Sequence, residues 1–364
     1  MTESLEKSNG NIAEDVSKLS KSREADWPTV LFFIHIHLLS LYGLWLFVFE
    51  ISWLTFIHFA LLSSLAVLGV TAGAHRLWAH RTYKASTGLR VFLMLCQTLA
   101  GQGTIYDWVQ NHRLHHAHFS TEGDPYDSRR GFLYAHILTR LRKLSPYQQK
   151  LKEQIDMSDL DDDFVITVQR NIYWLLYGVF FLLLPLNAPM EYWEESVLNA
   201  VFVIGFLRYG VVLHAAWLVE SAILVWGLKQ GEKYPADSNA VFLLDKTFWP
   251  QFHYIMPQDY KSGEYGNYVI GGFFKCLYHL FNRLTRFFSQ KYIKLSVFSD
   301  DGCTTAFIKV CAALELATNL KTVETSTVQS ALAKAAKTKG NIRACLEEAT
   351  TKQHLPAEHY LRRG

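Results

Sequence analysis

The stretch VLFFIHIHLLSLYGLWLFVF, from Val30 to Phe49, contains no charged residue over 20 positions. A helix rises about 1.5 Å per residue, so a run of this length crosses the roughly 30 Å hydrocarbon core of a bilayer. Trp27 and Pro28 precede the run, where an interfacial aromatic residue and a helix-initiating proline are expected. The stretch therefore predicts a membrane-spanning helix.

Three further apolar runs follow along the chain. Trp53 to Ala74 is charge-free and lies only a few residues beyond the first run, so the two predict a tight helical hairpin. Asn171 to Asn187 and Val197 to about Trp226 predict a second hairpin. We therefore expect an all-α fold with four transmembrane helices in two hairpins.

Basic residues orient these helices. Neither short loop, Glu50 to Ser52 or Leu186 to Ser196, contains Lys or Arg, whereas His75 to Arg170 contains 13. Because excess Lys and Arg mark the cytosolic side of a membrane protein, both termini and the central segment are expected in the cytosol.

The remaining segments complete a three-part organisation. Residues 1–26 are polar and charged, so we expect a disordered cytosolic N-terminus and no signal peptide. Residues 27–290 form the membrane domain with a helical cytosolic cap. Within it, the apolar stretch from Leu89 to Tyr106 is interrupted by polar and glycine residues and is expected to form a cytosolic helix that lies along the interface or packs on the bundle. Residues 291–364 are expected to form a cytosolic helical tail.

Composition excludes some functions. The net charge is only +3, so nothing in the total charge favours a polyanionic partner. The five cysteines have no CxxC spacing, which argues against a disulfide framework or a cysteine zinc site.

Two histidine clusters follow the first hairpin. His75 and His80 end the second apolar run, and His112, His115 and His116 share one face of a predicted helix at i, i+3 and i+4. Neutral imidazole is a good ligand for iron, zinc or copper, so the clusters predict a metal site. His75 and His80 are roughly 140° apart on an ideal helix. They reach one site only if the helix ends or bends between them; otherwise they serve different metals.

Other residues near the clusters have plainer interpretations. His118 is expected to be a neighbour of the site, and three histidines inside the spans to be hydrogen-bonded packing residues, namely His35, His37 and His58. The segment from Asp124 to Gly131 is either a charged turn or a source of carboxylates that orient the ligating histidines.

The motifs resemble those of the membrane acyl-CoA desaturases, of the stearoyl-CoA delta-9 type and with the look of the insect branch. The resemblance covers roughly residues 27–290. It rests on GVTAGAHRLWAHRTYK (Gly69 to Lys84), HRLHH (His112 to His116), MSDL (Met157 to Leu160) and MPQDYKSGEYG (Met256 to Gly266).

This resemblance implies an oxidoreductase of fatty acid biosynthesis in the endoplasmic reticulum membrane. Such enzymes hold two irons in the cytosolic cap and use dioxygen and electrons from cytochrome b5. Their reaction inserts a double bond into a long-chain saturated acyl-CoA.

The chain departs from the family pattern at two places. The third histidine box should read His-Asn-Tyr-His-His, but here it reads Pro250-Gln-Phe-His253-Tyr254, and only His253 stands at a ligand position. In the last span, the family's Asn and His are replaced by Glu220 and Leu224. Glu220 is either a carboxylate metal ligand or the ion-pair partner of a basic residue on a neighbouring segment.

The predicted ligand set is therefore His75, His80, His112, His115, His116, His253 and Glu220. Such a set satisfies one iron well, or two irons with more water. Two hypotheses follow: an acyl-CoA desaturase with altered iron coordination, or a non-catalytic relative that binds acyl-CoA or a partner. The intact first and second boxes favour retained metal chemistry.

Overall fold

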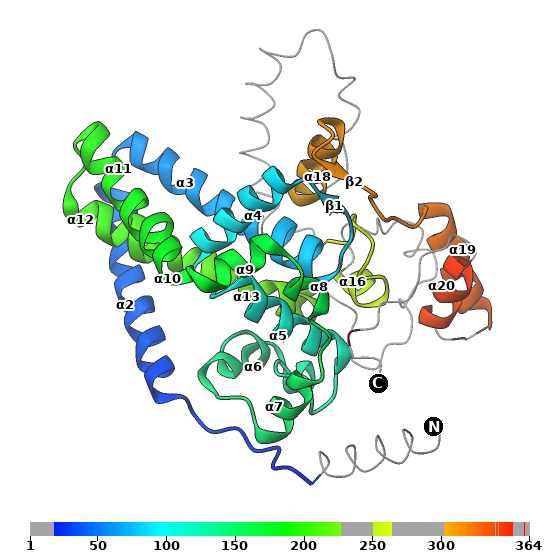
Figure 1. Ribbon diagram of the computed structural model, residues 1–364. Coiled ribbons are helices and arrows are strands. Elements are labelled where there is room, and N and C mark those ends of the chain that lie inside the picture. Colours follow the sequence, from blue (N-terminus) through cyan, green and yellow to red (C-terminus); the bar gives the residue numbers. More distant parts are fainter. Residues whose placement is uncertain are drawn as a thin grey trace. The chain divides into compact units, whose positions relative to one another are not determined.

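The computed structural model of the chain (Figure 1) describes residues 18–226, 250–263, 302–338, 340, 342–351 and 360. Most of the N-terminal segment expected to be disordered, and residues 227–249 and 264–301 of the expected domains, lie outside the described residues. The part of the chain that is described is mostly helical, in agreement with the predicted all-α class.

Four helices among the described residues are long and apolar enough to cross a membrane, so the predicted number of spans is confirmed. They run over Trp27–Phe49, Trp53–Ala79, Tyr173–Trp193 and Val197–Ser221. The chain is a multi-pass membrane protein. Helix α4 (Thr87–Ala100), in the stretch expected to lie along the interface, has 14 residues and is too short to span.

The first span is one α-helix, α2 (Trp27–Phe49), but each of the others contains a π-helical segment. The second span is α3 (Trp53–Leu68) and η1 (Gly69–Ala79). The third is α10 (Tyr173–Leu176), η4 (Tyr177–Leu183) and α11 (Leu184–Trp193). The fourth is α12 (Val197–Asn199), η5 (Ala200–Leu207) and α13 (Arg208–Ser221). π-helical segments are rare and often mark functional sites.

The described chain forms two compact units, and the first contains the four spans. This unit comprises residues 1–79, 91–221 and 359–364. Its helices approach closely at two glycines. A Cβ atom on Gly43 would lie 2.3 Å from the Phe202 carbonyl oxygen, and one on Gly69 would lie 2.2 Å from the Gln97 nitrogen. Small residues allow such close contact in membranes, where apolar burial alone does not hold helices together.

Glu195 holds together the two short loops that join the helices within each hairpin. Its carboxylate accepts hydrogen bonds from Ser52 Oγ at 2.9 Å, Asn199 Nδ2 at 2.8 Å and the Thr55 hydroxyl. Trp193 Nε1 also donates to Thr55 Oγ1, at 2.8 Å. The acidic residue therefore joins the start of α3 to the start of α12 at the end of the spans away from the cap.

Arg208 is a fully buried cation inside the fourth span. Its guanidinium donates to three backbone carbonyl oxygens, at 2.7 Å (Ile204), 3.0 Å (Leu99) and 2.9 Å (Phe181). An intramembrane charge must be satisfied inside the protein, and here carbonyl groups do so.

The rest of the first unit is the helical cap. Its elements are α4 from Val91 onward, α5 (Ile105–Ala117), η2 (Ser128–Arg130), α6 (Phe132–His136), η3 (Leu138–Leu141), α7 (Pro146–Glu153), α8 (Ser158–Asp161) and α9 (Phe164–Asn171).

The second unit comprises residues 80–90 and 222–358. It contains α14 (Ile223–Trp226), α16 (Pro250–Ile255), α18 (Cys303–Ala313), α19 (Thr325–Thr338) and α20 (Ile342–Thr351). Two short antiparallel strands, β1 (Lys84–Ala85) and β2 (Ala317–Thr318), pair Lys84 with Thr318. An apolar cluster that includes Phe252, Leu332 and Leu346 packs α16 against α19 and α20.

Candidate metal centre

Four of the predicted ligands form a buried group that could hold a metal ion. His75, His80, His112 and His253 each offer one ring nitrogen, and these four atoms all lie within 4.8 Å of one another. All four side chains are at most 2% exposed. The predicted metal-binding histidine cluster is therefore present in the structure.

The π-helix η1 explains how His75 and His80 serve one site. His75 lies in η1, the helix ends at Ala79, and His80 follows it directly. A π-helix bonds residue i to residue i+5, so residues five apart lie near one face. The roughly 140° separation on an ideal α-helix is thus removed by the wider helix and by its end.

His112 faces the group from α5. Its ring stacks on Trp108 with centroids 4.9 Å apart and meets the His75 ring edge-on at 4.7 Å. Burial lowers the pKa of His112 to about 3. The imidazole is therefore neutral at physiological pH, which is the form that binds a metal.

His115 and His116 lie beside His112 but outside the four-histidine group. Their ring centroids are 6.0 Å and 4.7 Å from that of His112. His115 Nδ1 donates to Asp124 Oδ1 at 2.8 Å, and both side chains are fully buried. Both interpretations of the segment from Asp124 to Gly131 therefore apply, each to a different residue. Asp124 is a carboxylate that orients a histidine. Asp127 pairs with the exposed Arg129, as in a charged turn.

Glu220 pairs with a basic residue on a neighbouring segment. Its Oε2 accepts from Arg140 Nη2 at 2.9 Å, and its Oε1 lies 3.5 Å from His112 Nδ1. The Arg140 guanidinium also lies 4.2 Å from the centroid of the Tyr126 ring. Sequence reasoning did not identify Arg140, because no local motif links residue 140 to the last span.

Arg113 is a second residue that sequence reasoning missed. Its fully buried guanidinium binds both carboxylate oxygens of Asp159 at 2.8 Å. It also donates to the carbonyl oxygens of Trp78 at 2.7 Å and Ala79 at 3.3 Å. Arg113 therefore fixes the end of η1 against α5, between the first and second histidine boxes. Asp159 belongs to the MSDL motif, which was the available signal.

In the family pattern, further histidines come from the third box and the last span. Of these positions, only that of His253 holds a histidine in this chain. The His253 ring lies 4.7 Å from the His80 ring within the second unit, and Tyr254 follows it at 5.3 Å. Leu224, in α14, has no donor atom.

The three histidines inside the spans are hydrogen-bonded, as predicted, but only His37 and His58 are partly buried packing residues, because His35 is exposed. His35 Nδ1 bonds the Leu31 carbonyl at 2.6 Å, and His58 Nε2 bonds that of Pro185 at 3.1 Å. His37 Nδ1 bonds the Phe33 carbonyl, and its Nε2 lies 3.0 Å from His214 Nε2.

Comparison with known proteins identifies the family. Over 249 residues the chain is 40% identical to an acyl-CoA delta-9 desaturase of Acheta domesticus, an alignment that covers 68% of this chain and 69% of that protein. The chain belongs to the acyl-CoA desaturase family. It is also 34% identical over 310 residues to an acyl-CoA delta-12 desaturase of the same species, covering 84% and 78% of the two chains. The stearoyl-CoA desaturase of Homo sapiens is 36% identical over 247 residues, covering 66% and 67%. No family model matches the chain.

Membership of the desaturase family gives the histidine group its chemical context. Both stearoyl-CoA and insect desaturases are among the relatives, so the predicted resemblance is confirmed. In this chain, however, the buried group consists of four histidines, two from the first box, one from the second and one from the third.

Proposed function

We propose that this chain is an oxidoreductase that inserts a double bond into a saturated long-chain fatty acyl-CoA, using dioxygen and histidine-bound iron. The observation that carries the proposal is the buried group of His75, His80, His112 and His253 in a member of the desaturase family. In this reaction two neighbouring methylenes lose two hydrogens. Dioxygen becomes two waters with the help of two electrons and two protons, and we propose cytochrome b5 as the electron donor.

The residues present fit one iron ion. Four neutral imidazoles with nitrogens within 4.8 Å of one another are a suitable donor set for such an ion. His115, His116 and the Glu220 carboxylate lie beside this group. They would complete the coordination of one iron or contribute to a second, as in the family's expected pair. Bound iron would supply the activation of dioxygen.

The protein's own residues prepare this site in three ways. Arg113 holds the segments that carry His75 and His112. The Asp124 carboxylate fixes the tautomer of His115, which leaves Nε2 as the nitrogen for a metal. Burial of the four grouped histidines excludes water, which protects a reactive intermediate from side reactions.

The same proposal includes the cellular setting. We place the protein in the endoplasmic reticulum membrane with both termini in the cytosol. Thirteen Lys and Arg residues between His75 and Arg170, and none in the two hairpin loops, support this orientation.

One specific observation favours a second function, that of a non-catalytic acyl-CoA-binding or partner protein. Tyr254 and Leu224 stand where the family pattern has histidines, and Glu220 stands where it has an asparagine. Missing ligands weaken metal binding steeply, because the loss of an outer partner alone costs roughly 10- to 100-fold in affinity.

Iron analysis of the detergent-purified full chain tests the proposal. We expect at least one iron per chain, abolished by His75→Asn and retained by His118→Asn, because His118 lies outside the four-histidine group. A protein without iron after supplementation would contradict the enzyme and support the non-catalytic function.

Complementation of desaturase-deficient yeast tests the activity. We expect the unmodified chain to produce unsaturated fatty acids. A variant carrying Pro250→His, Tyr254→His, Glu220→Asn and Leu224→His restores the family's ligands. If only that variant supports growth, the native site is inactive on that substrate.

A further inference from the structure

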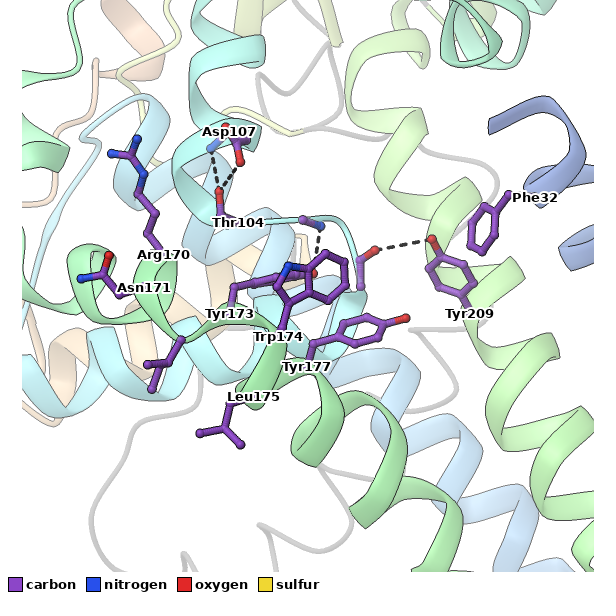
Figure 2. A pocket seen from close by; sticks show the side chains of 13 residues that line it. Phe32, Thr104, Asp107, Arg170, Asn171, Tyr173, Trp174, Leu175, Tyr177 and Tyr209 are labelled. Carbon is purple, nitrogen blue, oxygen red and sulfur yellow. Dashed lines mark hydrogen bonds between the residues drawn. The ribbon is translucent and has the colours of Figure 1, made fainter. Parts of the chain in front are cut away.

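A cavity of about 690 Å³ opens in the first unit, at the cap end of the spans (Figure 2). Its walls come from α2, from the loop between α4 and α5, from the start of α5, from the end of α9, from the start of the third span and from α13. This size lies within the range of small-molecule sites. None of the predicted metal ligands lines the cavity.

One side of the cavity faces lipid. Trp174 is 79% exposed, Leu175 is 65% exposed and Phe32 is 47% exposed. All three belong to spanning helices, so their exposed faces meet the bilayer. Tyr173 and Trp174 begin the third span, and tryptophan and tyrosine are typical of the level of the lipid headgroups. A ligand of this cavity would therefore enter from one leaflet of the membrane.

The polar end of the cavity carries one cation and one anion. Arg170 and Asp107 both line it and lie outside the spans (Figure 2). Asp107 Oδ2 accepts from Thr104 Oγ1 at 2.6 Å, which fixes the carboxylate at the start of α5. The Arg170 guanidinium lies 4.2 Å from the Tyr106 ring centroid and 3.9 Å from Asp161. Opposite charges at one end of an apolar cavity match a zwitterionic headgroup.

An aromatic wall lies beside this polar end. The ring centroids of Tyr173, Trp174 and Tyr177 are 5.4 to 5.9 Å apart. The Gly103 nitrogen donates to the Tyr173 hydroxyl at 3.1 Å, which holds that ring in place. Aromatic faces attract quaternary ammonium groups. The wall therefore favours choline over a smaller, more strongly hydrated ammonium.

We propose that this cavity binds one phospholipid with a phosphocholine headgroup. The phosphate pairs with Arg170, the choline lies against the aromatic wall and Asp107, and an acyl chain runs past Phe32 and Leu175. Asp107 disfavours the polyanionic head of an acyl-CoA at this place. The site is independent of the metal centre and of the proposed reaction.

Native mass spectrometry of the full chain in detergent tests the proposal, with phosphatidylcholine, phosphatidylethanolamine and phosphatidylglycerol of the same acyl chains as probes. We expect one retained phosphatidylcholine per chain and weaker retention of the other two lipids. Trp174→Ala and Arg170→Gln should each weaken retention by roughly fivefold.

Two control variants distinguish binding in this cavity from non-specific lipid contact at the protein surface. Tyr192 is 83% exposed at the other end of the third span, and Arg129 is an exposed paired arginine of the cap. Tyr192→Ala and Arg129→Gln should leave retention unchanged. Equal effects of both variant pairs would mean only non-specific lipid at the protein surface and would overturn the proposal. Retention of phosphatidylglycerol as strong as that of phosphatidylcholine would overturn the zwitterionic specificity.

Discussion

At the scale of single residues, the candidate metal centre is supported by residues outside the four-histidine group. Asp124 illustrates this, because its buried carboxylate receives the Nδ1 hydrogen of His115 at 2.8 Å. Asp124→Asn keeps the shape but removes the charge. We expect the variant to bind iron roughly 10- to 100-fold more weakly in competition with a chelator. Asp127→Asn, which affects only a surface pair with Arg129, should bind like the parent. Equal iron affinities for the parent and both variants would show that Asp124 does not support metal binding.

Arg113 is expected to matter for stability as well as for the site. Its removal deletes the hydrogen bonds that Arg113 donates to Asp159 and to the carbonyl oxygens of Trp78 and Ala79. Breaking a fully buried charge pair costs about 3–5 kcal/mol. Asp159 is 31% exposed, so Arg113→Met should cost less than this but should still clearly lower the thermal unfolding midpoint. Arg129→Met should change it little, because exposed pairs contribute about 0–1 kcal/mol. Similar midpoints for both variants would show that Arg113 is not a structural anchor.

At the scale of the elements, charge-free runs predicted the spans, whereas helix type could not be read from the sequence. η1 has no charged residue before Arg76. Its amino-acid sequence does not distinguish a π-helix from an α-helix. Its first residue, Gly69, lies against the backbone at Cys96 and Gln97, a contact that only the folded structure shows. The sequence therefore showed that His75 and His80 needed a bend or a helix end, but not which device supplies it.

The loops between the spans give a pH prediction. Burial raises the pKa of Glu195, but hydrogen bonds from Thr55, Asn199 and Ser52 outweigh it and hold the pKa at about 2. The folded-state pKa lies below the ordinary value of 4.5, so the stabilisation is present above about pH 4.5 and is lost as the pH falls toward 2. Glu195→Gln should lower the unfolding midpoint near neutral pH, with a difference that shrinks in acid. Glu191→Gln is the control, and a constant difference across pH would contradict the role of the charge.

At the scale of the whole molecule, the sequence predicted the four spans and the four clustered histidines, but not the contacts between distant segments. His253 could be assigned only by aligning Pro250–Tyr254 with a family motif, since one histidine in a degenerate box has no periodicity of its own. The pairing of Glu220 with Arg140 joins residues 80 positions apart, and the sequence offered several basic candidates. Local patterns therefore predicted the histidines of the first two boxes, a family motif predicted His253, and only the three-dimensional structure showed the partners of these residues.

The orientation of the whole chain gives the last prediction. The hairpin loops at Glu50–Ser52 and Glu194–Ser196 lack Lys and Arg, so both should face the lumen. A glycosylation acceptor inserted between Glu194 and Glu195 should be modified in microsomes, whereas one inserted after Ser145 in the cap should not, because the modifying enzyme acts only in the lumen. The reverse pattern would place His75 and His112 on the lumenal side, away from a cytosolic electron donor. It would contradict both the orientation and the proposed partner.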